Sequence, residues 1–263
     1  MPARAGEPPP SAQVSPAATR PAAAGETNRP ALPPEASVIA GAGRFGALSA
    51  AVQASVRRFA DNAVPIDTRQ AELAALAKSG GTDAAAVLMA LGDEHTYLNS
   101  AAIEALGGVK AEGVAAYLTG KMTDGDPRVL AAAVKSLARQ QGETAVPAIA
   151  TVVRNNRQRP DGFQDMVCAA CVQALGETRS ARAIPVLDAE LRETVGTTLH
   201  QDYGSEIVRA LSALHLAEAR PVLSAYADRM SQTLPLYDSN PLGKRYIEGK
   251  INEARAAAAS LGN

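Results

Sequence analysis

The chain has 263 residues, of which 46% are hydrophobic and only 3% aromatic, and its formal net charge is −1. This composition suits a core of aliphatic and small side chains, and no apolar run reaches the roughly 18 residues of a membrane span. The near-zero charge and the absence of tryptophan disfavour a general nucleic-acid binder, which needs a basic surface to neutralise phosphates.

Residues 1–36 are rich in Pro, Ala, Ser and Gly and carry almost no large apolar residues. Such a segment cannot offset its ordering entropy by burial, so we expect a disordered tail. It lacks the charged and then apolar pattern of a secretory signal peptide, which favours a cytoplasmic protein. Its composition also resembles the N-termini of type III secreted effectors, and secretion by a signal-peptide-independent route is the alternative.

Residues 43–60 are expected to form one amphipathic helix. Its apolar stripe comprises Phe45, Leu48, Val52, Val56 and Phe59. We interpret this helix as a cap that covers the apolar end of the array that follows. A membrane-surface helix is the alternative, and it is disfavoured because the polar face is not rich in cations.

A repeated pattern occupies residues 66–231. Each unit has a leucine near the end of a first helix, and these are Leu76, Leu106, Leu137, Leu175 and Leu211, spaced 30, 31, 38 and 36 residues apart. An apolar residue stands three positions earlier, and a small residue stands one position earlier (Ala75, Ala105, Ser136, Ala174 and Ala210). Twelve positions later stand Leu88, Leu118, Ile149, Leu187 and Leu223. This agreement predicts five helix–turn–helix units that bury their apolar faces by stacking.

The ends of the helices carry their own signals. Pro147, Pro185 and Pro221 occupy the same place in the last three units, where proline suits the first turn of a second helix. Asp126 before Pro127 is typical of an N-cap. Glycines 107, 142 and 176 follow the first helices, where we expect a left-handed residue to terminate the helix.

The segment D-P-R-V-L-A-A-A-V-K-S-L at 126–137 and I-P-V-L at 184–187 resemble the short HEAT-like repeats common in bacteria. The resemblance implies an all-α, right-handed α-solenoid of about five repeats that is used mainly for protein binding. The first unit departs from the pattern, because Ala86 stands in the place of the proline.

Residues 232–263 are expected to close the array with a C-terminal capping helix that opens at Asn240 and Pro241. Its expected apolar stripe comprises Leu242, Tyr246, Ile247, Ile251 and Ala254.

Few residues suggest chemistry. Cys168 and Cys171 form a C-x-x-C inside a first helix and in line with core columns, so we interpret them as structural. A zinc site would need two further ligands, and His95, His200 and His215 are scattered. We therefore expect no metal, no cofactor and no catalysis. An enzyme like the HEAT-like lyases remains an alternative, although no motif here tests it.

Two insertions lengthen the later repeats, Arg154–Phe163 and Val195–Tyr203. Loops on a repeat scaffold often collect on its binding side, and the resemblance implies that second helices line a concave face. The expected partner-binding residues are Thr123, Arg154, Arg157, Arg159, Asp188, Arg192 and Asp228. Their mixed charge favours a protein or peptide over a polyanion. The first hypothesis is thus a scaffold or adaptor, the second an exported effector, and the oligomeric state is left open.

Overall fold

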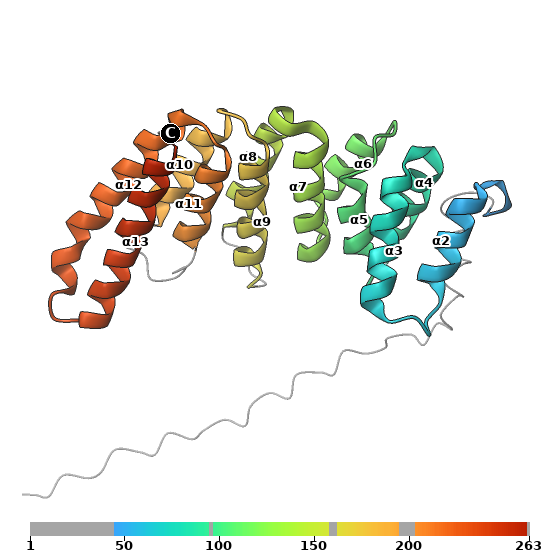
Figure 1. The fold of residues 1–263 in the computed structure, drawn as a ribbon, viewed down its shortest axis with the longest axis horizontal. Coiled ribbons are helices and arrows are strands. Elements are labelled where there is room, and N and C mark those ends of the chain that lie inside the picture. The colour runs from blue at the N-terminus through green and yellow to red at the C-terminus, as the bar shows by residue number, and fades with distance from the viewer. Residues whose placement is uncertain (1–44, 95–96, 158–161, 195–202, 262–263) are drawn as a thin grey trace, which may run out of the picture. The chain divides into compact units, whose positions relative to one another are not determined.

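The described part of the chain is helical and contains no β-strand (Figure 1). The computed structural model describes residues 45–94, 97–157, 162–194 and 203–261, so the tail expected at residues 1–36 lies outside the described part. The first helices of the units are α3 (Ile66–Ser79), α5 (Asn99–Leu106), α7 (Pro127–Gln141), α9 (Gln164–Glu177) and α11 (Tyr203–Ala213). The second helices are α4 (Gly81–Gly92), α6 (Val114–Lys121), α8 (Val146–Asn156), α10 (Ala183–Glu193) and α12 (Arg220–Thr233). At the ends lie α2 (Ala50–Ala60) and α13 (Pro241–Ser260), and short 3₁₀ turns cover Phe45–Ala47, Gly142–Ala145, Ala217–Ala219 and Leu234–Tyr237.

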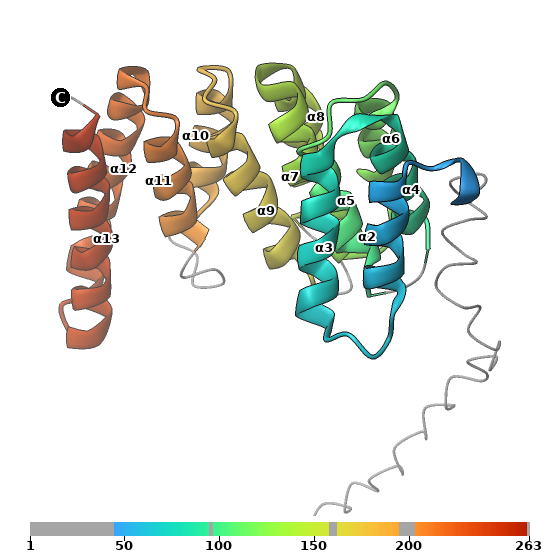
Figure 2. The same ribbon diagram turned by 45° about the vertical axis from the view of Figure 1, so that its right-hand side comes forward.

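Consecutive units stack through their first helices. Helix α3 contacts α5, α5 contacts α7, α7 contacts α9, and α9 contacts α11. Each second helix from α4 to α10 packs against the first helix of the following unit (Figures 1 and 2). The described part of the chain is therefore an all-α solenoid of helical repeats, as the sequence predicts. None of the described helices combines the length and the apolar character needed to cross a membrane.

One continuous core runs through the stacked helices. The five leucines that end the first helices are each no more than 1% exposed, and the five apolar residues twelve positions later are each 0% exposed. Each such side chain contributes about 1.5–3 kcal/mol when it is fully buried. The two columns of the sequence pattern are thereby confirmed as the core.

The helix starts follow the sequence signals. The Asp126 Oδ1 atom accepts a hydrogen bond from the Arg128 backbone N–H at 2.8 Å, and Pro127 opens α7. Proline also lies in the first turn of α8, α10 and α12. These local signals favour the observed starts of α7, α8, α10 and α12.

The glycines after the first helices differ from the expectation. Gly142 has a left-handed φ of 53°, but Gly107 is right-handed and Gly176 lies inside α9. A Cβ atom on Gly107 would lie 3.1 Å from the Cα atom of Ser136 on the next first helix. Gly107 therefore ends α5 as predicted but without the left-handed conformation, and the prediction of a terminator is wrong for Gly176. Both glycines allow neighbouring helices to approach closely.

Helix α2 covers the N-terminal end of the array. It packs on α3 and buries Val52, Val56 and Phe59. It begins at Ala50 rather than near residue 43, because the Ser49 side chain accepts a hydrogen bond from the Val52 backbone N–H and caps the helix there. The expected single helix is therefore a short 3₁₀ turn followed by α2.

Helix α13 covers the C-terminal end. It packs on α11 and α12 and buries Ile247 and Ile251. The expected stripe of α13 is wrong at two positions, because Leu242 is 78% exposed and Tyr246 is 37% exposed. Leu242 precedes Ile251 by nine residues, and at about 3.6 residues per turn this places it on the opposite side of the helix.

Candidate protein-binding surface

One position of the repeat is polar in every unit, and it lies at or close to the C-terminal end of each second helix, except that α12 continues beyond it. Five residues after each buried apolar residue of a second helix stand Asp93, Thr123, Arg154, Arg192 and Asp228. All five residues are exposed. Because they occupy equivalent places in consecutive units, the stacking repeats them along one side of the array. We call these five residues the second-helix row.

The two N-terminal residues of the row, Asp93 and Thr123, form an ion pair and hydrogen bonds with neighbouring residues. The Lys121 ammonium lies 2.9 Å from an Asp93 carboxylate oxygen, and the Tyr117 hydroxyl donates to the same oxygen at 3.0 Å. Burial, with the nearby Asp93 charge second, raises the pKa of Tyr117, so this hydroxyl stays protonated. The Thr123 hydroxyl donates to the Gly120 carbonyl oxygen at 3.0 Å. The end of α4 and the end of α6 are thereby linked, and their charges are compensated.

The middle of the row carries two arginines in different electrostatic states. Arg192 pairs with Asp188 one turn earlier on α10, at 2.5 Å. Arg154 donates a hydrogen bond to the Thr151 hydroxyl on its own helix at 3.3 Å. No ion pair joins Arg154 to any acid within the part of the chain that the structure describes. Arg154 therefore presents an uncompensated positive charge on an exposed helix face.

A buried ionic cluster lies behind these arginines. The Arg157 guanidinium, just past α8, donates to both carboxylate oxygens of Glu190 on α10. The side chain of Glu190 is only 3% exposed, and the Tyr203 hydroxyl donates to its Oε2 atom at 3.2 Å. Burial, followed by the Glu190 charge, raises the pKa of Tyr203. Arg157 and Tyr203, one from each insertion of the later repeats, therefore both contact Glu190, and the half-buried Arg157 is already paired within the protein.

The structure places the other expected site residues as follows. Helix α8 continues through Asn156, so Arg154 belongs to the helix rather than to the inserted loop. Arg159 lies outside the described residues, as do His95 and His200. Asp228 is exposed on α12.

Sequence reasoning missed Glu190 and Asp93. Asp93 shares the register position of the row and is visible by that criterion. Glu190 follows the core residue Leu187 by three positions, so it projects from the buried side of α10, where a carboxylate needs a partner.

The two cysteines belong to the core, as predicted. Cys168 and Cys171 are both buried in the interior of α9 and are not joined in a disulfide. Burial raises the pKa of the Cys168 thiol to about 11 and raises that of Cys171 well above its ordinary value. Such thiols stay protonated at neutral pH, which makes them poor nucleophiles.

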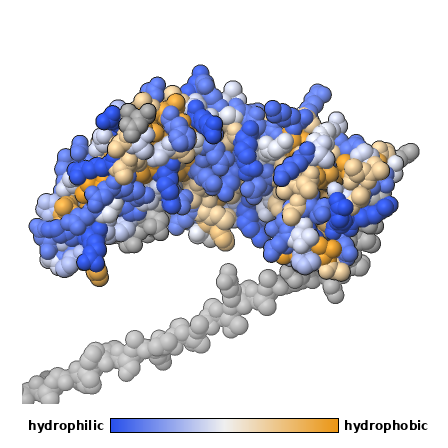
Figure 3. Space-filling model, in the orientation of Figure 1, coloured by the Kyte–Doolittle hydropathy of each residue, from blue (hydrophilic) through white to orange (hydrophobic). Residues whose placement is uncertain are grey.

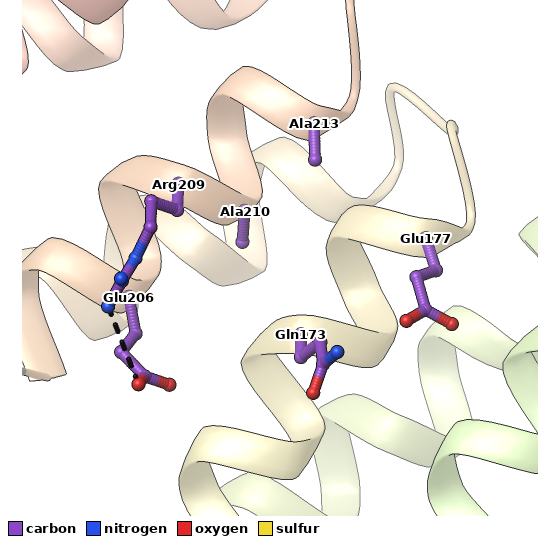
Figure 4. Close-up of a pocket in the computed structure, with 6 residues that line it drawn as sticks. All are labelled: Gln173, Glu177, Glu206, Arg209, Ala210 and Ala213. Carbon is purple, nitrogen blue, oxygen red and sulfur yellow. Dashed lines mark hydrogen bonds and ion pairs between the residues drawn. The ribbon is translucent and has the colours of Figure 1, made fainter.

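A groove lies between two first helices, α9 and α11 (Figure 4). Its volume is about 440 Å³, and it is lined by Gln173, Glu177, Glu206, Arg209, Ala210 and Ala213. Between α5 and α7, Arg139 reaches Glu104 at 3.2 Å and bridges the helices. The equivalent residues between α9 and α11 are Ala213 and Gln173, and Arg209 turns to Glu206 on its own helix at 3.5 Å. The groove is open because a short alanine replaces the bridging arginine.

A family model described as HEAT repeats matches residues 88–160. This range runs from α4 to just past α8 and includes Thr123, Arg154 and Arg157. No curated protein matches the chain.

Proposed function

We propose that this chain, whose residues 88–160 match the HEAT-repeat family, is a non-catalytic scaffold that binds a protein or peptide on its second-helix row. HEAT repeats commonly mediate protein interactions, and the family is generally non-catalytic. Protein binding, the general role of HEAT repeats, is thus assigned to the second-helix row of this chain.

The uncompensated charge of Arg154 is the observation that carries the proposal. Its neighbour in the row, Arg192, is neutralised by Asp188, and Arg157 behind it is neutralised by Glu190. An acidic group of a partner would complete the pattern at Arg154. The aspartate at the C-terminal end of the row, Asp228, would disfavour a long polyanion by repulsion.

The buried cluster would hold this surface in shape. Arg157, Glu190 and Tyr203 connect α8, α10 and α11 through hydrogen bonds. A surface that is rigid before binding loses less entropy on association. The cluster thus has a supporting role in binding, although its own polar atoms are occupied.

Affinity capture from a lysate of the source organism tests the proposal. The full chain serves as bait in three forms, namely wild type, Arg154→Glu and Arg245→Glu. Arg245 is exposed on α13, outside the five units that carry the row and far along the chain from Arg154, so its reversal is a matched change of charge. We expect one stoichiometric partner with the wild type and Arg245→Glu, and at least tenfold less with Arg154→Glu. Equal recovery by all three baits, or no partner at all, would contradict the proposal.

A further inference from the structure

A second pocket lies at the N-terminal end of the array. It adjoins the turn that joins α2 to α3, and Figure 2 shows this turn in the ribbon. Its volume is about 500 Å³, and Val64, Pro65, Ile66 and Tyr97 form its apolar walls. Arg69 on α3 also lines it. This size is within the range of about 300–1,000 Å³ that is common for ligand pockets.

Arg69 is a buried cation that is held in a fixed orientation. It is only 9% exposed, and its Nε atom donates to the Phe59 carbonyl oxygen at 2.5 Å. Within the described residues, its two Nη nitrogens have no hydrogen bond and no ion pair. The carboxylate of Glu72, one turn further along α3, is instead 3.0 Å from Arg58. A buried guanidinium without a carboxylate carries a positive charge that no negative charge balances. Its planar N–H donors match the geometry of a carboxylate.

The rim of the pocket is unusually apolar for an exposed surface. Tyr97 is 79% exposed and Ile66 is 39% exposed. On the face drawn in Figure 3, the described surface is largely hydrophilic and apolar residues gather in small patches. A small molecule could fill the pocket, but it would leave most of the Tyr97 ring in water. A peptide that crosses the rim would cover both side chains.

We propose that this pocket binds a peptide segment in which a side-chain carboxylate stands next to an aliphatic or aromatic residue. The carboxylate accepts hydrogen bonds from the Arg69 Nη groups, and the apolar side chain packs on Val64, Ile66 and Tyr97. The pocket shares no residue with the second-helix row, so it gives the scaffold a second contact point. Two contacts on one chain raise avidity when a partner spans both.

Selection from a displayed library of random heptapeptides, with the full chain as target, tests this assignment. Enriched peptides are resynthesised with a fluorophore, and their Kd is measured by fluorescence anisotropy. We expect them to share Asp or Glu beside a large apolar residue. Changing that Asp to Asn, or Glu to Gln, should weaken binding at least tenfold.

Variants of the protein locate the site. Tyr97→Ser should weaken binding at least fivefold, and because the ring is exposed this change leaves the fold intact. Arg154→Glu should leave the Kd unchanged, which separates this pocket from the second-helix row. Arg69→Gln should abolish binding, and its folded state is verified by circular dichroism. Peptides that bind the Tyr97→Ser variant as tightly as the wild type would overturn the assignment, and so would amide analogues that bind as tightly as the acidic peptides. A small molecule with one carboxylate and one phenyl ring, 4-phenylbutanoate, would also overturn it by binding as tightly as the peptides.

Discussion

A Cβ atom on Gly176 would lie 2.9 Å from the Cα atom of Ala210, so α9 and α11 touch almost backbone to backbone at this point. The same relation recurs between Gly107 and Ser136 on α5 and α7, at 3.1 Å. There the Ser136 hydroxyl also donates to the Ile103 carbonyl oxygen at 2.8 Å. The glycine of one unit and the small residue of the next therefore set how closely consecutive repeats stack.

Gly176→Ala should destabilise the protein. Alanine alone would favour a helix over glycine by about 1 kcal/mol, but the new methyl group meets the backbone of Ala210, which cannot move aside as a flexible side chain would. We expect a net loss of about 1–3 kcal/mol in the free energy of unfolding, measured by urea denaturation. Gly249→Ala is the control, since nothing lies within 4 Å of that position on α13. A Gly176→Ala protein as stable as the control would show that the contact is not tight.

Glu190→Ala should leave the Arg157 guanidinium without its carboxylate and the Tyr203 hydroxyl without its acceptor. Breaking a buried ion pair costs several kcal/mol, and because Arg157 is 35% exposed we expect roughly 2 kcal/mol. Thermal unfolding followed by circular dichroism measures the loss. Glu193→Ala, an exposed carboxylate on the same helix, should change stability by less than about 0.5 kcal/mol. Equal effects of the two changes would argue against a structural role for Glu190.

Much of the fold follows from local patterns that repeat. Leu137 and Ile149 are buried because the same apolar spacing recurs in five units, and Asp126 caps α7 by a signal contained in two adjacent residues. These features depend on helical periodicity and end chemistry, which sequence displays directly.

The remainder depends on contacts between distant residues. Arg157 and Glu190 are 33 positions apart and meet only when the helices stack. A glycine near the end of a predicted helix is compatible with termination or with close packing. At Gly176 the close approach of Ala210 on the next first helix explains the glycine, and only the structure shows this contact. The second-helix row is predictable in part, since its polar register is periodic but the ion pairs that compensate Asp93 and Arg192 are not.

The cysteines should be inert in the folded protein. Burial raises the pKa of Cys168 to about 11 and that of Cys171 further above its ordinary value, so the thiolate is scarce at pH 8. Titration with an aromatic disulfide reagent should find almost no reactive thiol in the native protein and two per chain in urea. Rapid reaction of either thiol without denaturant would contradict the burial of α9.

The Asp126 cap should make stability depend on pH. The hydrogen bond from the Arg128 side chain, ahead of the backbone hydrogen bonds, lowers the pKa of Asp126. The folded state thus favours the ionised carboxyl, so its contribution is complete above about pH 4 and is lost as the pH falls through the lowered pKa. Asp126→Ala should cost about 1 kcal/mol at pH 7, and less at pH 2.5. Urea denaturation at both values measures this difference.

Asp126→Asn provides the control for this titration, because asparagine caps a helix without a titrating charge. The difference in stability between Asp126→Asn and Asp126→Ala should not change with pH. A wild-type advantage over Asp126→Ala that grows on acidification would contradict a stabilising role for the ionised carboxyl.

Site-specific photo-cross-linking of the captured partner tests the central claim most directly. A benzophenone amino acid is placed at Asn155, which is exposed on α8 beside Arg154, or at Arg245 on α13. Binding on the second-helix row predicts a covalent adduct with the partner from Asn155 and none from Arg245. An adduct from Arg245 alone would contradict it and would place the partner on the C-terminal end of the array.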